Sequence, residues 1–159
     1  MSVRLYSIAF ACVAMTGCAS IVNDVTAPVR FETLNASGGE VKDVECKLEN
    51  DYGQQIIKTP TTFNVRRSSK DLQITCAKTG ETDGQGVAVS RANGGMAANI
   101  LLGGGIGAII DHNKGTAYTY PAWIQIVMGK IITFDRKADV EGKPNKGLES
   151  PAASPVAAK

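Results

Sequence analysis

The sequence has few aromatic residues, a single histidine and little excess charge of either sign. Aromatic residues make up 6% of the 159 residues. The 17 basic and 15 acidic side chains leave a formal net charge of +2, which excludes a nucleic-acid binder that depends on a clustered basic surface. The shortage of aromatic rings argues against a large aromatic-lined ligand pocket. No nucleic-acid partner is therefore expected, and no small-molecule substrate is identified.

Groups that could carry catalysis or hold a metal are also scarce. His112 stands in a polar turn beside Asp111, with no paired-carboxylate motif, nucleophile–base arrangement or metal-ligand spacing around it. Gly103-x-Gly105-x-x-Ala108 has the spacing of a phosphate-binding glycine loop. It lacks the preceding strand and the distant acidic residue of a dinucleotide-binding unit. The sequence therefore predicts a protein that is not an enzyme and that needs no cofactor and no metal.

The first 17 residues have the features of a secretory signal peptide. Arg4 supplies the positive charge, and residues 5–15 form an apolar run that is too short to span a membrane. Small residues, Thr16 and Gly17, then precede Cys18, as they do before a signal-peptidase cleavage point. The pattern predicts export from the cytoplasm.

The end of this leader, Met15-Thr16-Gly17-Cys18, resembles the lipobox of bacterial lipoproteins, although Leu is usual at the first position. The resemblance implies cleavage before Cys18 and acylation of Cys18 with fatty acids such as palmitate. More than one acyl chain gives stable membrane anchoring. The next residue is Ala19 rather than Asp, which by the same resemblance implies sorting to the outer membrane, facing the periplasm.

Two cysteines remain after these assignments. Cys12 would be removed with the leader and Cys18 acylated, which leaves Cys46 and Cys76 in an oxidising compartment. Each lies on the apolar face of an alternating segment. The pattern predicts a disulfide that closes a loop of about thirty residues. Two separate buried thiols are the alternative, and a metal pair is less favoured because no histidine or further cysteine lies nearby.

Short alternating segments between turn residues predict a mainly β fold, a small antiparallel β-sandwich. The expected strands are residues 29–33, 44–48, 55–58, 62–66, 72–76, 123–128 and 131–134. Pro60 should end or offset its strand because proline donates no ladder hydrogen bond. The strand over 123–128 is expected to complete the sheet begun before residue 92, and Gly129-Lys130 to turn the chain back.

Residues 92–110 contain no charge and are rich in glycine. Small or polar residues recur there every four positions, which on a helix would form one stripe suited to close packing. The predicted helix-packing residues are Gly95, Asn99, Gly103, Gly107, Asp111 and Gly115. We expect a helical segment or hairpin over 92–112, inserted in the β domain, that packs internally or self-associates. Insertion into a membrane stays open as another interpretation.

The remaining boundaries follow from composition. Residues 137–159 are mostly Pro, Ala, Ser, Gly and charged residues, which predicts a disordered tail. The predicted organisation is a signal peptide over 1–17, a lipidated tether over 18–26, a β-sandwich domain over 27–136 that includes the insertion over 92–112, and a tail over 137–159.

Several short motifs stand in a recognisable order. They are Cys18-Ala19-Ser20-Ile21-Val22-Asn23, Cys46-x-Leu48-x-Asn50-x-x-Gly53, Thr59-Pro60, Val65-x-Arg67-Ser68, Leu72-x-Ile74-x-Cys76 and Tyr120-Pro121. Together they resemble a group of proteobacterial outer-membrane lipoproteins with a PEGA-like β-sandwich and a glycine-zipper-like segment. The resemblance covers about residues 15–128, and it implies a fold and an envelope location but no reaction.

Two functions of different classes are therefore compared. The first is a lipid-anchored envelope protein with a structural or protein-binding role. Its partners would be the membrane, through Cys18, and an envelope protein or a second copy. The alternative is a self-assembling, membrane-inserting or secretion-associated component that uses the glycine-rich segment.

Overall fold

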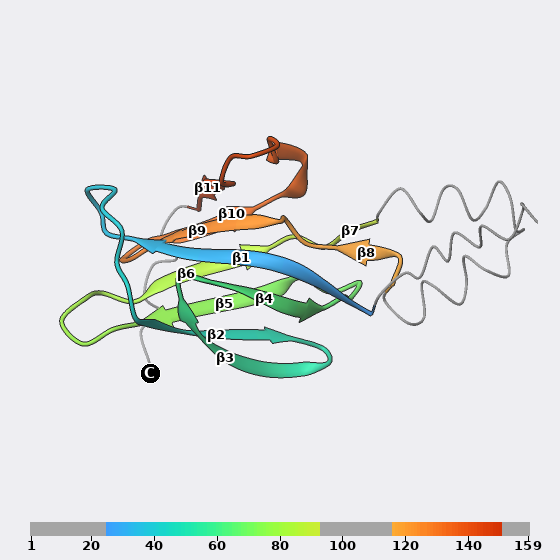
Figure 1. Cartoon of the computed structure of the whole chain (residues 1–159), viewed down its shortest axis with the longest axis horizontal. Helices are drawn as coiled ribbons and strands as arrows, with labels where there is room; N and C mark the ends of the chain where they lie inside the picture. Colours follow the sequence, from blue (N-terminus) through green and yellow to red (C-terminus); the bar gives the residue numbers. More distant parts are fainter. Residues whose placement is uncertain (1–24, 93–115, 151–159) are drawn as a thin grey trace, which may run out of the picture.

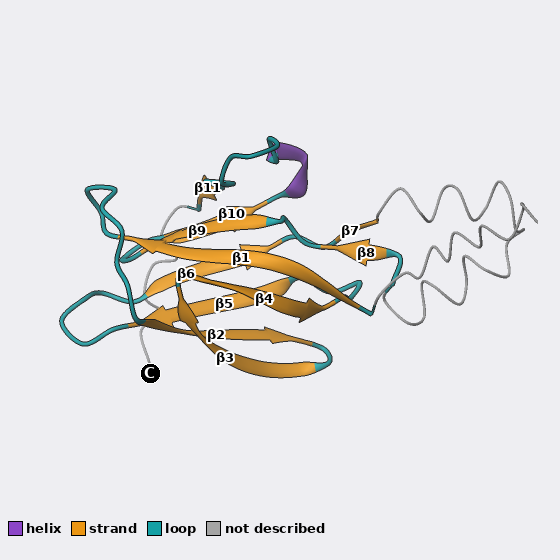
Figure 2. Ribbon diagram, in the orientation of Figure 1, coloured by secondary structure: helices purple, strands orange, loops and turns teal. Residues whose placement is uncertain are grey.

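The structure is a computed structural model that describes residues 25–92 and 116–150, and these residues are mainly β with several sheets (Figure 1, Figure 2). The elements are β1 (Thr26–Leu34), β2 (Val44–Asn50), β3 (Gly53–Thr59), β4 (Thr61–Arg66), β5 (Leu72–Ala77), β6 (Gly84–Ala88), β7 (Arg91–Ala92), β8 (Tyr118–Thr119), β9 (Trp123–Val127), β10 (Ile131–Phe134), the 3₁₀ helix η1 (Arg136–Ala138) and β11 (Leu148–Glu149). All seven predicted strands are present, and Pro60 separates β3 from β4, as expected.

The strands form two larger sheets and a small one. The first has the order β4-β1-β9, the second β11-β10-β6-β5-β2-β3, and β7 pairs only with β8. Alternation along β2 and β5 directs one face of each strand inward, and in both strands every second residue is buried over most of the length. Both larger sheets contribute to one apolar cluster. Its fully or nearly fully buried members include Val29, Phe31, Ile124 and Ile126 from the first sheet and Leu48, Leu72, Ile74, Ile132 and Phe134 from the second.

Strand directions differ from the antiparallel arrangement that the sequence predicts. β9 pairs with β1 in parallel, and β10 pairs with β6 in parallel. The expectation that the late strand joins the earlier sheet is therefore confirmed for β9. The expected turn back at Gly129-Lys130 is wrong as a hairpin, because β10 belongs to the other sheet. The chain therefore crosses from one sheet to the other between β9 and β10, and Ile126 and Ile132 on either side of the crossing are both buried in the common cluster.

One strand that the pattern does not predict is β6, because glycine in a short segment usually indicates a turn. Here glycine makes room for neighbouring side chains. A Cβ on Gly86 would lie 2.9 Å from Cε2 of Phe134, and one on Gly84 would lie 3.0 Å from Cγ2 of Ile126. The two glycines therefore allow the Phe134 ring and the β9 side chains to pack directly on the β6 backbone.

The prediction of a disordered tail is wrong for residues 137–150. Asn145 is buried, its backbone N–H donates to the Trp123 carbonyl at 2.8 Å, and its side-chain amide donates to Asp135 O and Asp139 Oδ1. The Ser150 N–H donates to Ile131 O at 2.8 Å. The amino-acid composition does not predict an ordered segment here, because the segment is attached to β9 and β10 by hydrogen bonds of the backbone and of one asparagine rather than by apolar side chains. Residues 151–159 lie outside the described residues.

The predicted insertion lies almost entirely outside the described residues. Its first residue, Ala92, is the last residue of β7, and Arg91 and Ala92 pair with Thr119 and Tyr118 of β8. The two chain ends that lead to residues 93–115 are therefore held side by side. Thr26, assigned to the tether by the prediction, is instead the first residue of β1.

Candidate functional site

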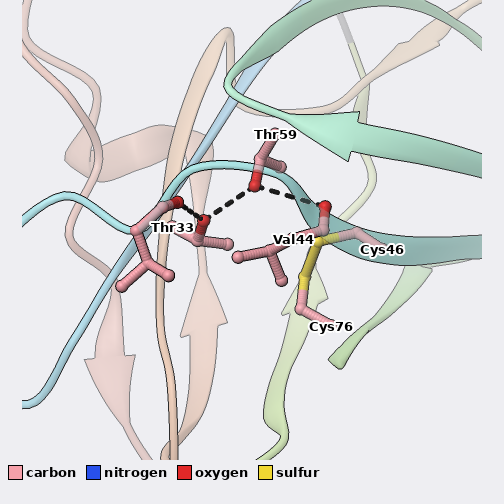
Figure 3. Close-up of a disulfide and its surroundings, with 6 residues drawn as sticks. Thr33, Val44, Cys46, Thr59 and Cys76 are labelled. Carbon is pink, nitrogen blue, oxygen red and sulfur yellow. Dashed lines mark hydrogen bonds between the residues drawn. A yellow bond between two sulfur atoms is a disulfide. The ribbon is translucent and has the colours of Figure 1, made fainter. Parts of the chain in front are cut away.

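Cys46 and Cys76 form a disulfide, as the sequence predicts (Figure 3). They lie directly opposite each other on the antiparallel pair β2–β5, and their Cα atoms are 4.0 Å apart. Both residues are fully buried. A buried disulfide inside a sheet is a structural element, because no reductant or partner reaches it without opening the strands.

Two buried threonines lie beside the disulfide (Figure 3). The Thr33 hydroxyl donates to the carbonyl of Val41 at 2.5 Å, and its oxygen lies 2.7 Å from that of Thr59. Thr59 Oγ1 in turn lies 3.5 Å from the carbonyl oxygen of Val44. The chain of hydrogen bonds connects β1, β2 and β3 and satisfies both hydroxyls. These groups therefore stabilise the fold and are not available for chemistry.

A second group of polar residues lies at one end of the domain, at right in Figure 1. We call this the basal end. It comprises Val25 with the start of β1, the β2–β3 turn over 50–53, the stretch over 66–71, and the β7–β8 pair. These segments meet there through the hydrogen bonds described next.

Arg67 holds the start of β1 against β8. Its backbone N–H donates to the carbonyl of Val25 at 2.9 Å. Its guanidinium donates from Nε to the carbonyl of Thr26 at 3.2 Å and from Nη1 to that of Tyr118 at 3.1 Å. The Arg67 side chain therefore connects the start of β1, which follows residue 24, to β8, which follows residues 93–115.

Tyr120 forms the buried centre of the basal end. Its hydroxyl donates to the carbonyl of Lys70 at 2.8 Å and accepts from Asn50 Nδ2 at 3.2 Å. Asn50 Nδ2 also donates to the carbonyl of Arg66 at 3.0 Å. Burial raises the pKa of Tyr120 above its usual value, more than the hydrogen bond from Asn50 lowers it. The tyrosine is therefore a neutral donor that fixes the β4–β5 connection.

Serines complete this hydrogen-bonded end. The Ser68 hydroxyl donates to Asp51 Oδ1, and Ser68 Oγ accepts from the Lys70 N–H at 2.9 Å. The Ser90 hydroxyl donates to the Ser68 carbonyl at 2.5 Å, and its backbone N–H donates to Asp71 Oδ1 at 2.9 Å. The carboxylates of Asp51 and Asp71 thus each accept a hydrogen bond from a serine.

The basal end also carries a groove of about 280 Å³ between β3 and β4. β3 and β4 are edge strands of their respective sheets, so no further strand closes the space between the two sheets at this edge. The floor is apolar and the rim is polar. The floor contains Leu48, Phe63, Val65 and Leu72, and the rim contains Asn50, Tyr52, Gln55, Asn64 and Arg66.

An aromatic–cation pair stands on the rim of this groove. The guanidinium carbon of Arg66 lies 4.4 Å from the centre of the Tyr52 ring, within the range of a cation–π contact. Arg66 is exposed, and the next residue, Arg67, is partly buried. No sequence motif marks Tyr52 as a site residue, although its position in a tight turn after an alternating strand is a signal for an exposed hairpin tip.

A further polar cluster lies on the outer face of the first sheet. Glu32 is buried, ion-paired with Arg30 at 2.5 Å and hydrogen-bonded by Gln125 Nε2 at 2.8 Å. Arg30 stacks over the Trp123 ring at 4.2 Å, and the buried indole N–H lies beside Glu32 without a hydrogen bond of ordinary geometry. Burial alone would raise the pKa of Glu32, but the hydrogen bond from Gln125 and the Arg30 guanidinium hold it below its usual value. The parallel pairing of β1 and β9 makes this cluster, and no local pattern predicts it.

Asp135 is expected to titrate near pH 2. Arg91 Nε donates to Asp135 Oδ1 at 3.1 Å, Arg91 Nη2 donates to Oδ2, and these bonds, with one from the Lys137 N–H, lower the carboxyl pKa from 3.8 to about 2. Because the folded-state pKa is depressed, the stability from this charge is present above pH 3.8 and is lost as the pH falls through about 2.

The Arg91→Gln variant tests this assignment through carboxyl carbon chemical shifts recorded against pH. The Asp135 pKa should return toward its ordinary value in this variant. Arg136→Gln removes the charge of the next residue, which is not among the groups that lower this pKa, and should leave it low. Equal titrations in Arg91→Gln and the wild type would contradict the assignment.

The predicted site residues fall into two groups. The structure brings Cys46 and Cys76 together. Outside the described residues lie the predicted lipidation site Cys18, the lone His112 and the helix-packing set Gly95, Asn99, Gly103, Gly107, Asp111 and Gly115. Asn50, Arg67, Ser68 and Tyr120, which belong to the motifs behind the family resemblance, meet at the basal end.

Over residues 25–92 and 116–150, no group of three or more His, Cys, Asp or Glu side chains is placed to hold a metal ion. Within the same residues there is no helix long and apolar enough to cross a membrane. Comparison of the chain with protein families, with curated proteins and with solved structures gives no match.

Proposed function

We propose that this protein is a lipid-anchored envelope protein without catalysis, attached through Cys18 to the periplasmic face of the outer membrane. Its β domain, a two-sheet sandwich, would hold the glycine-rich residues 93–115 next to the anchor. The role is structural or protein-binding, and the contact surface is supplied by the domain and by the glycine-rich segment.

One observation carries this proposal. Arg67 donates to the carbonyls of both Thr26 and Tyr118, and β7 pairs with β8. The chain from the predicted anchor and both ends of the glycine-rich segment therefore emerge at the basal end. A domain that holds two such segments at one end is suited to positioning them relative to each other.

The intact mass of protein purified from the membrane fraction tests the anchor. The expected mass is that of residues 18–159 with three acyl chains, and reduction should add two hydrogens for the Cys46–Cys76 bond. A mass that still includes Met1, or one without acyl chains, would overturn the proposal.

The Cys18→Ala variant separates the proposal from its alternative, a membrane-inserting or self-assembling component. Without acylation, the variant is expected to leave the membrane fraction during an alkaline wash, because an acylated cysteine would be its attachment. The matched control is Cys12→Ala, which changes a residue of the leader and should fractionate as the wild type. Retention of Cys18→Ala in the washed membrane, in a form whose mass shows that residues 1–17 have been removed, would favour insertion by the glycine-rich segment.

A further inference from the structure

The exposed surface of the basal end includes apolar and aromatic side chains. Two large apolar or aromatic side chains stand open there, since Val25 and Tyr52 are each 44% exposed. The polar groups beneath them are satisfied internally by the Asn50, Ser68 and Tyr120 hydrogen bonds. Tyrosine is favoured where an apolar region meets water, because its ring is apolar and its hydroxyl is polar.

This surface carries exposed residues of both charge signs, two cations and two carboxylates that accept hydrogen bonds from serines. Arg66 and Lys70 form no ion pair with any residue of the described ranges, and both are exposed. The nearby carboxylates, Asp51 and Asp71, accept hydrogen bonds from Ser68 and Ser90. An arginine next to a tyrosine ring presents several donors that match a phosphate group.

The length of the tether limits where this surface can lie. Val25 comes seven positions after Cys18, so even a fully extended chain spans only about 25 Å between them. β1 has nine residues and carries the chain about 30 Å further to the opposite end of the domain. An anchored domain therefore keeps its basal end much closer to the lipid than its far end.

From these observations we infer that the basal surface formed by Val25, Tyr52, Arg66 and Lys70 lies against the membrane. Tyr52 sits at the headgroup level, and Arg66 and Lys70 contact phosphates of anionic lipids. This inference rests on the proposed anchoring by Cys18. It adds an orientation and a lipid-binding surface that the anchor alone does not specify.

Quenching of a single tryptophan by brominated lipids tests the orientation. The protein would carry Trp123→Phe with Tyr52→Trp, acylated and reconstituted in vesicles of phosphatidylethanolamine and phosphatidylglycerol brominated high on the acyl chains. The matched control combines Trp123→Phe with Thr79→Trp, at an exposed site beyond β5 at the far end of the domain. Tryptophan at position 52 should lose most of its emission, and tryptophan at position 79 should keep it.

Quenching at position 79, or at neither position, would overturn the inference. The charge contribution is tested by adding Arg66→Gln and Lys70→Gln to the Tyr52→Trp protein, which should reduce quenching in these vesicles. Equal quenching with and without the two cations would exclude phosphate binding and so overturn the proposed surface. The intact mass is checked first. Absence of acyl chains would refute the proposed function, whereas an acylated protein with the wrong quenching pattern would refute the orientation alone.

Discussion

Replacing Cys46 and Cys76 together with alanine is expected to lower the free energy of unfolding by about 3–4 kcal/mol. The disulfide closes a loop with a sequence separation of 30 residues, and cross-linking a loop of this size restricts the unfolded chain by that amount in the chain-entropy model. The effect is large for a domain whose total stability is about 5–15 kcal/mol. Urea unfolding of oxidised wild type and of the double variant measures it.

Reduced wild-type protein is the control for this prediction. It keeps both sulfur atoms in the core but lacks the bond between them. Its free energy of unfolding therefore distinguishes the effect of the cross-link from the effect of packing two fully buried side chains. The reduced protein should be nearly as destabilised as the double variant, with a small remainder from lost packing. Equal stability of the oxidised and reduced proteins would refute the prediction.

Gly147→Ala is expected to destabilise the segment that follows η1 by about 3 kcal/mol. Alanine disfavours the left-handed backbone conformation at this position, and its Cβ would overpack the space against β10. Gly147 has φ of +61°, and a Cβ there would lie 2.4 Å from Cγ2 of Ile132 and 2.7 Å from the Thr133 carbonyl oxygen. A backbone atom of β10 cannot move aside without disturbing the sheet. The expected result is separation of β11 from β10.

Gly142→Ala is the matched control in the same segment. Gly142 also has a positive φ, +71°, but nothing lies within 4 Å of the added Cβ. It should therefore cost only about 1 kcal/mol, from backbone conformation. Hydrogen exchange at the Asn145 and Ser150 amides, which donate to Trp123 and Ile131, should accelerate in Gly147→Ala and much less in the control. Similar exchange rates in the two variants would contradict the prediction, because the clash at position 147 would then be relieved without separating β11 from β10.

The strand positions and the disulfide could be predicted from the sequence because they depend on local patterns. Alternation places Cys46 and Cys76 on buried faces whatever their partner strands are. Pairing could not be predicted in the same way. The parallel contact of β1 with β9 joins residues about ninety positions apart, and the cluster of Arg30, Glu32 and Trp123 exists only through that pairing.

Other elements were missed because their stabilising groups are not apolar. β6 has glycine where a buried strand would usually carry a side chain, and the Phe134 ring occupies that space. The segment after η1 is polar in composition, yet Asn145 fixes it with side-chain and backbone hydrogen bonds. At the basal end, Tyr120 and Asn50 are seventy residues apart and meet only in the folded chain.

The position of β1 has a mechanical consequence. β1 is the central strand of its sheet, with β4 antiparallel on one side and β9 parallel on the other, and the N-terminal chain continues from its first residue. A pull on that chain acts along the strand axis and loads the hydrogen bonds to both neighbours in shear, all at once, instead of opening them one after another. The disulfide joins β2 to β5 in the other sheet and does not share this load. Resistance to such a force therefore depends on the β1 ladders.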